Sequence, residues 1–200
     1  MRPDAERAAL LVIDVQRDFC PGGALAVPRG DAVVPVLNRC IESAVRHGVP
    51  VYASRDWHPA VTNHFKAYGG EWPPHCVQQT EGAQFHPELR LPASATLITK
   101  GDEPDTSGYS AFDGHTSTGR TVADDLRARG IDRLYVGGLA TDYCVRASVL
   151  AARGEGFGVA VLRDAVAAID VHPGDADRAV TEMRQAGAEL TSSAEWPFAD

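Results

Sequence analysis

The sequence predicts an α/β protein in which a mostly parallel sheet lies between two layers of helices. Two observations lead to this prediction. Short apolar runs alternate along the chain with segments that look helical, and a glycine stands at or just beyond the end of each helical segment. Repeated strand–helix units form parallel sheets with helices on both faces. The length of 200 residues fits one domain over residues 1–200.

Six segments are expected to be strands because they are short and apolar or β-branched. They are residues 9–13, 49–53, 95–99, 133–139, 158–163 and 188–191. Four segments are expected to be helices: residues 31–47, 121–129, 142–153 and 174–185. Residues 59–92, with their Pro, Gly, His and Trp, predict an ordered functional excursion. The flanks, residues 1–7 and 192–200, carry no motif and are expected to be extensions.

The composition argues against several classes of protein. Hydrophobic residues make up 44% and charged residues 23%, so the chain is neither disordered nor fibrous. The formal net charge of -8 argues against a nucleic-acid or membrane partner, since both attract basic patches. The polar start, and Asp14 within the first apolar stretch, argue against a signal peptide. We therefore expect a soluble cytoplasmic protein whose four cysteines are free thiols.

Chemically reactive side chains stand at the ends of four predicted strands. Asp14 follows the first, Asp56 and His58 the second, Lys100 the third and Cys144 the fourth. Ligands of open α/β sheets bind beyond the carboxyl ends of the strands, so we expect these side chains to lie close together. A thiol, a carboxylate and a cation suit acyl transfer from an amide, because one group must pass the thiol proton to the leaving nitrogen.

Each of these residues also has a purely structural interpretation. Cys144 fits a buried structural thiol, Asp14 fits a residue that caps a turn, and Lys100 fits a solvated charge at the end of a strand. The position of Cys144 at the start of a helix favours its thiolate, and the turn before it could aim backbone N–H groups at an oxyanion. Cys20 and Cys40 are expected to be structural.

A second group of residues suits a metal ion. Asp56 and His58 stand on alternate residues, and His64 and His75 follow on the excursion. Asp and His side chains bind first-row divalent ions, although surface loops also gather histidines without a function. Nearby tryptophans and a Pro-Pro step favour a walled pocket. The other histidines are expected at surface or cap positions: His47, His86, His115 and His172.

Seven stretches carry a resemblance to a known family. They are VIDVQRDFCPGG at 12–23, SRDWH at 54–58, HF at 64–65, WPPHC at 72–76, KG at 100–101, YSAF at 109–112 and GLATDYCV at 138–145. In their order and spacing the chain resembles the nicotinamidase (pyrazinamidase) branch of the isochorismatase-like cysteine hydrolases. The D-x-H and W-P-P-H-C motifs point to this branch because other branches generally lack the metal site.

The resemblance implies a fold, a site and a reaction. The fold is a three-layer α/β/α structure with a six-stranded parallel sheet, and the reaction is hydrolysis of nicotinamide, and of pyrazinamide, through a cysteine thioester. The implied catalytic triad is Asp14, Lys100 and Cys144. The implied ligands of one divalent ion (Zn, Fe or Mn) are Asp56, His58 and His75, with His64 as a further, variable ligand. The implied oxyanion hole is the backbone N–H groups of Ala140 and Cys144, after a cis peptide before Ala140. The implied pyridine pocket is lined by Phe19, Trp72 and Tyr109.

Three other functions are weighed against this one. An amidohydrolase of the same superfamily could act on a ureido, carbamoyl or maleamate-type substrate, which has no pyridine nitrogen for a metal. Isochorismatase cleaves a vinyl ether, but that branch lacks the cysteine. A non-catalytic scaffold on this fold would not need the triad. The oligomeric state stays open and includes a homo-oligomer.

Overall fold

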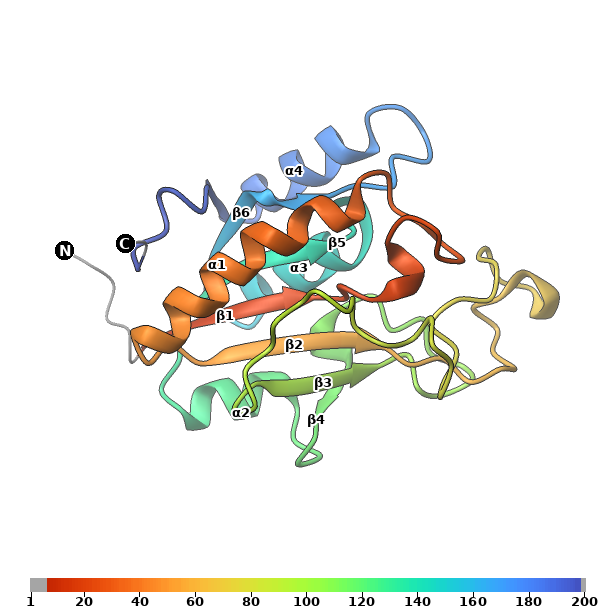
Figure 1. Cartoon of the computed structure of the whole chain (residues 1–200), viewed down its shortest axis with the longest axis horizontal. Helices are drawn as coiled ribbons and strands as arrows, with labels where there is room; N and C mark the ends of the chain where they lie inside the picture. The colour runs from red at the N-terminus through yellow and green to blue at the C-terminus, as the bar shows by residue number, and fades with distance from the viewer. Residues whose placement is uncertain (1–6, 199–200) are drawn as a thin grey trace.

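The computed structural model describes residues 7–198 and has a single sheet as its middle layer (Figure 1). The seven strands lie in the order β4-β3-β2-β1-β5-β6-β7. They are β1 (Ala8–Ile13), β2 (Val51–Asp56), β3 (Thr96–Lys100), β4 (His115–Thr116), β5 (Arg133–Leu139), β6 (Gly158–Ala167) and β7 (Glu189–Thr191). Each neighbouring pair is parallel except β3 and β4. The α/β class with a mostly parallel sheet is confirmed.

Helices cover both faces of the sheet, which makes the expected three layers. They are α1 (Val33–Arg46), α2 (Val122–Ala128), α3 (Arg146–Gly154) and α4 (Asp175–Gln185). In Figure 1, α1 crosses in front of the sheet, whereas α3 lies behind it. Single turns of 3-10 helix occur at Arg17–Phe19, Gly30–Ala32, Lys66–Tyr68 and Ala111–Asp113.

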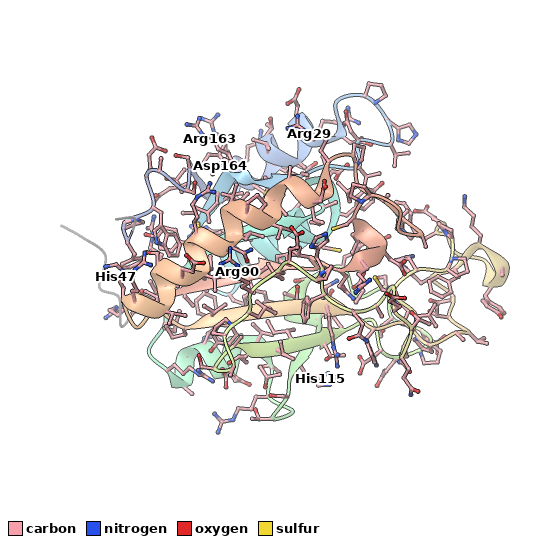
Figure 2. All side chains as sticks on the ribbon, in the orientation of Figure 1. Arg29, His47, Arg90, His115, Arg163 and Asp164 are labelled. Carbon is pink, nitrogen blue, oxygen red and sulfur yellow. The ribbon has the colours of Figure 1, made fainter. Side chains whose placement is uncertain are left out.

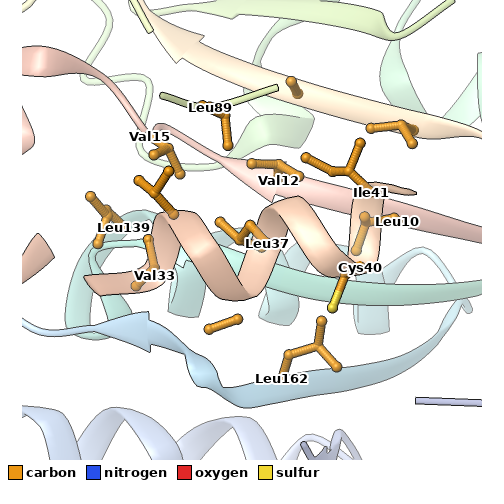
Figure 3. Close-up of a cluster of buried hydrophobic side chains, with 14 of the residues drawn as sticks. Leu10, Val12, Val15, Val33, Leu37, Cys40, Ile41, Leu89, Leu139 and Leu162 are labelled. Carbon is orange, nitrogen blue, oxygen red and sulfur yellow. The ribbon is translucent and has the colours of Figure 1, made fainter. Parts of the chain in front are cut away.

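Strand β1 is apolar throughout because it is buried on both faces. Leu10 and Val12 pack with α1 on one face, where Leu37 and Ile41 fill the core (Figure 3). The alternate residues of β1 belong to a second core cluster, with side chains of α2 and α3. The continuous apolar run that predicted a central strand therefore serves two cores, one on each side of the sheet.

The strand count of six is wrong by one short strand. His115 and Thr116 form β4, which pairs antiparallel with Ile98 and Thr99 at the edge of the sheet. Two residues are too few to show alternation, and the antiparallel pairing places β4 outside the strand–helix repeat. The predicted helix at 142–153 is also divided. Thr141–Val145 forms a π-helical turn, and the α-helix begins only at Arg146.

The last residues are not a simple extension. Trp196 and Phe198 are buried, and their rings lie 4.7 and 6.2 Å from the ring of Tyr135 on β5. The predicted N-terminal extension falls outside the described residues except for Arg7, which pairs with Asp132. The motif-free C-terminal flank therefore contributes to the core.

The segment between β2 and β3 has no long helix or strand, as predicted, and contains only the short turn Lys66–Tyr68. In Figure 1 it extends beyond the carboxyl ends of β2 and β3. His47 lies just after α1 and His115 on β4, both on the outside of the molecule (Figure 2). Within residues 7–198, no helix has the length and apolar content needed to cross a bilayer.

Candidate active site

Four adjacent parallel strands bring the predicted catalytic side chains together. In the sheet order β3-β2-β1-β5, Lys100 and Asp56 are the last residues of their strands and Asp14 follows β1. Cys144 lies in the π-helical turn that follows β5. All four side chains are buried, with between 0 and 7% of their surface exposed. Strand register alone therefore assembles residues that are up to 130 positions apart in sequence (144 minus 14).

The ammonium group of Lys100 is the centre of this cluster. Its Nζ lies 2.8 Å from Asp14 Oδ2 and donates to the carbonyl oxygen of Gly108 at 2.8 Å. It also donates to Asp56 Oδ1 and lies 3.6 Å from Cys144 Sγ. The other oxygen of Asp14 accepts a hydrogen bond from Ser54 Oγ at 2.7 Å. We call these four side chains, Asp14, Asp56, Lys100 and Cys144, the lysine cluster.

Burial and the charges within the lysine cluster together set the protonation of its members. Burial raises the pKa of the Cys144 thiol well above its ordinary value, and Lys100 opposes this effect only in part. Burial also raises the pKa of Asp14 despite the opposing charge of Lys100. Burial favours a neutral Lys100 amine, but Asp14 and Asp56 outweigh it and raise the Lys100 pKa. The resting cysteine is therefore a thiol, and Asp14 is a stronger base than an ordinary carboxylate.

Three histidines form a second cluster beside the first. Ring nitrogens of His58, His64 and His75 lie within 4.8 Å of one another. His58 Nδ1 is 2.9 Å from the carbonyl oxygen of Gly101, and His75 Nδ1 is 2.8 Å from that of Pro73. Each Nδ1–H therefore donates to a backbone carbonyl, which leaves the lone pair of Nε2 free in a neutral ring. We call His58, His64 and His75 the histidine cluster.

The histidine cluster has the properties of a metal site. Within the described residues His58 Nε2 is buried and has no hydrogen-bond partner. Burial, followed by the neighbouring imidazoles, lowers the pKa of His64 to about 4. Burial also lowers the pKa of His75. Neutral imidazoles with unshared lone pairs are what a divalent ion requires, so these residues fit such an ion.

Asp56, a member of the lysine cluster, also lies beside the histidine cluster. One carboxylate oxygen accepts from Lys100, and the other, Oδ2, lies 3.6 Å from His58 Nε2. Burial raises the pKa of Asp56, but Lys100 and the neighbouring His58 and His75 together outweigh burial and hold that pKa below its ordinary value. The residue after Lys100 makes this packing possible. A Cβ at Gly101 would lie 2.5 Å from the His58 ring, and the backbone there has a φ of +63°.

A narrow pocket lies above the two clusters. Its walls include the three predicted residues, Phe19, Trp72 and Tyr109, and it reaches Cys144, His64 and His75. Trp72 Nε1 donates to the Tyr109 hydroxyl at 2.8 Å, so these two walls are fixed to each other. Trp57 does not line the pocket. It lies under the guanidinium of Arg55, 4.1 Å from the ring centroid. An apolar pocket with reactive groups at its base suits a small aromatic ligand.

Sequence reasoning missed three walls of the pocket. Tyr143 lies 5.0 Å from Trp72 in an edge-on arrangement, and Leu25 and Ile169 complete the lining. Tyr143 precedes the candidate nucleophile, and this position was a usable signal. Leu25 and Ile169 are ordinary apolar residues on irregular segments, so no pattern identifies them. The peptide bond between Leu139 and Ala140 is cis, as the resemblance implies.

Comparisons with known proteins agree with this geometry. The family model for the isochorismatase domain matches residues 8–195. The nicotinamidase of Escherichia coli (strain K12) is 44% identical over 204 residues, covering 94% of this chain and 96% of that protein. The nicotinamidase/pyrazinamidase of Mycobacterium tuberculosis is 39% identical over 188 residues, covering 92% and 98%. Among solved structures, the pyrazinamidase of Pyrococcus horikoshii in complex with zinc has a TM-score of 0.85 and 46% identity, covering 93% and 99%.

The match extends over nearly all of the described residues, and the relatives align over nearly their whole length. The chain therefore belongs to the isochorismatase-domain family.

Proposed function

We propose that the protein is a nicotinamidase, which hydrolyses nicotinamide to nicotinate and ammonia. The observation that carries this proposal is the contact of the lysine cluster with the histidine cluster, through Asp56, at the base of one aromatic pocket. The relatives at 38–44% identity are named as nicotinamidases, which supports the same substrate. An acidic loop with Asp102, Glu103 and Asp105 follows Lys100 in the sequence, and the range of accepted amides stays open.

The lysine cluster supplies the groups that amide hydrolysis needs. Asp14 takes the proton of the Cys144 thiol, and the thiolate attacks the carboxamide carbon. The C–N bond then breaks as Asp14 gives this proton to the leaving nitrogen, and ammonia departs. Water then attacks the thioester and gives one proton to Asp14. The C–S bond breaks as Asp14 passes this proton to the sulfur, and the acid product leaves as a carboxylate after losing its other proton to solvent. Lys100 holds Asp14 beside Cys144 throughout and balances the charge of both.

Backbone N–H groups of Ala140 and Cys144 form the proposed oxyanion hole. Contacts of this kind typically lower a barrier by about 3–4 kcal/mol. Phe19, Trp72 and Tyr109 would hold the pyridine ring and exclude bulk water from the thioester.

A divalent ion fits the histidine cluster, and Asp56, His58, His64 and His75 would hold it. The zinc complex of the pyrazinamidase from Pyrococcus horikoshii supports a metal here, and Zn, Fe and Mn all suit these donors. When bound, the ion supplies a Lewis acid at the base of the pocket, next to a pyridine nitrogen or a water molecule.

Ammonia release from nicotinamide by purified, metal-analysed protein tests the proposal. Benzamide, which has the same shape without a ring nitrogen, is the matched control substrate. Fast turnover of nicotinamide and slow turnover of benzamide are expected. If neither amide is hydrolysed by metal-loaded protein, the substrate assignment is wrong. Turnover of a carbamoyl or ureido compound in its place would favour the other amidohydrolases of the superfamily.

A further inference from the structure

The side chain of Gln16, which follows β1, contacts the backbone of Asp56, the last residue of the neighbouring strand β2. Gln16 is fully buried, and its Oε1 accepts from the Asp56 N–H at 2.8 Å. Its Nε2 donates to the Asp56 carbonyl oxygen at 2.8 Å and to that of Ala83 at 2.8 Å. The side-chain amide therefore pairs with both peptide groups of Asp56, as the backbone of an adjacent strand would.

The end of the β1–β2 ladder explains why a side chain is needed here. The two strands pair in register up to Val12 and Ala53, and Asp14 N–H still donates to the Ser54 carbonyl at 3.2 Å. At Asp14 the backbone turns away, with a φ of +47°. The next backbone groups of β2 that face β1 are those of Asp56, and a buried peptide group without a partner is costly. Gln16 supplies the missing partner.

The other edge of Asp56 is held by ordinary strand pairing. Asp56 is in register with Lys100 on β3, and the following Trp57 N–H donates to the Lys100 carbonyl at 3.0 Å. Asp56 is thus fixed to β3 on one side and to Gln16 on the other. Its carboxylate lies between Lys100 and His58, so a small rotation of its backbone would move Oδ2 relative to the histidine cluster.

We infer that Gln16 is a positioning residue for the metal site, because its amide fixes the Asp56 backbone and thereby aims Asp56 Oδ2 at the histidine cluster. This inference rests on the proposed role of Asp56 as a ligand. Groups that orient a metal ligand from behind typically change metal affinity by about 10- to 100-fold when they are removed. Gln16 does so through the backbone of the ligand, and it fixes the loop at Ala83 with the same amide.

Asn38 offers a matched control. It is also a buried amide, 4% exposed, and it also pairs with backbone groups about fifty residues away. Its Nδ2 donates to the Glu88 carbonyl at 2.8 Å, and its Oδ1 accepts from the Arg90 N–H at 2.8 Å. Arg90 lies beside α1 (Figure 2), and neither Glu88 nor Arg90 is a proposed ligand. Loss of this amide costs stability in a similar way without touching Asp56.

The test compares Gln16→Met with Asn38→Leu, two nearly isosteric changes that remove an amide. Zn²⁺ affinity of the metal-free proteins is measured by competition with a chromophoric chelator, and thermal midpoints are measured in parallel. We expect Gln16→Met to raise the Zn²⁺ dissociation constant about tenfold or more, and Asn38→Leu to leave it within about twofold. Both variants should lower the thermal midpoint of the metal-free protein, because each leaves buried peptide groups unpaired.

Two results would overturn the inference. One is a Zn²⁺ affinity of Gln16→Met within twofold of wild type, and the other is an equal loss in Asn38→Leu. If Gln16→Met does not fold, Gln16→Asn replaces it, since it keeps an amide in the cavity but shortens its reach by one methylene. If neither folds while Asn38→Leu does, Gln16 is required for the fold and the inference fails. The assay needs no turnover, so a wild-type protein that binds Zn²⁺ but spares nicotinamide would overturn only the proposed function.

Discussion

The lysine cluster and the histidine cluster are neighbours, but they satisfy their buried polar atoms differently. In the lysine cluster, one carboxylate oxygen of Asp14 and one of Asp56 face Lys100, a cation that the chain itself supplies. In the histidine cluster, burial keeps His64 and His75 neutral, and His58 Nε2 makes no hydrogen bond with the described residues. The first cluster is therefore complete in the folded chain, whereas the second is suited to a cation from solution. Apart from changes at Asp56, which contacts both clusters, a change in one cluster should leave the defining property of the other intact.

The largest expected effect separates chemistry from metal binding. Cys144→Ala should lower nicotinamide turnover by at least about a thousandfold, because the nucleophile is lost. The same variant should keep wild-type zinc content, since Cys144 belongs to the lysine cluster. Ammonia release and metal analysis of one preparation measure both quantities. Retained turnover would contradict the covalent mechanism, and loss of zinc would place the thiol in the metal site.

The converse change is His75→Ala. We expect a loss of Zn²⁺ affinity on the order of a hundredfold or more, together with loss of turnover, because one of the clustered ring nitrogens is removed. Alkylation of Cys144 by iodoacetamide in the metal-free protein should proceed at the wild-type rate. Normal zinc content in this variant would show that His75 is not a ligand.

Acid should destabilise the metal-free protein through the histidine cluster. The pKa of His64 is about 4 in the fold, against about 6.5 for an ordinary histidine. Between these values the unfolded chain binds more protons, so stability falls as the pH is lowered from about 6.5 towards 4. Between pH 7.5 and 5, the thermal midpoint of wild type should fall more than that of His64→Gln, by an amount on the order of 3 °C. If the thermal midpoints of the two proteins fell equally with pH, His64 would not be a buried neutral histidine.

The smallest expected effect concerns the wall of the pocket. Trp72→Phe removes the donor of the hydrogen bond to Tyr109, and Tyr109→Phe removes its acceptor. One hydrogen bond contributes about 1 kcal/mol, which corresponds to roughly a fivefold rise in KM. Because the same bond is broken from either side, the two variants should agree in KM and keep wild-type kcat and zinc content. A clear difference between them would mean that one ring contacts the substrate in a way the other does not.

The sequence was sufficient to predict the parts of the site that depend on strand order. Asp14, Asp56 and Lys100 stand at the ends of strands, and parallel pairing forces such residues to one edge of the sheet. The resemblance to a family placed Phe19 and Tyr109 at the pocket, where the structure also has them. The proximity of the residues at the strand ends could be predicted because it needs only the order of the elements.

The features that were missed depend on long-range packing. Gln16 lies inside the motif at residues 12–23, but its proposed role follows from the turn of the backbone at Asp14. Strand β4 has two residues and no pattern of its own. Trp196 was assigned to an extension because the flank has no motif, although an aromatic residue there was a reason to expect burial. Each of these depends on the position of a partner that is distant in sequence.

The burial of Trp196 near the C-terminus means that intrinsic tryptophan fluorescence can report on this part of the structure. The three tryptophans lie in different environments: Trp72 in the pocket, Trp57 under Arg55, and Trp196 packed on Tyr135. A form that keeps only Trp196 would change its emission when the C-terminal segment detaches. A form that keeps only Trp72 would respond when the pocket fills. Two single-tryptophan variants would thus report unfolding and ligand binding by separate optical signals, without an attached dye.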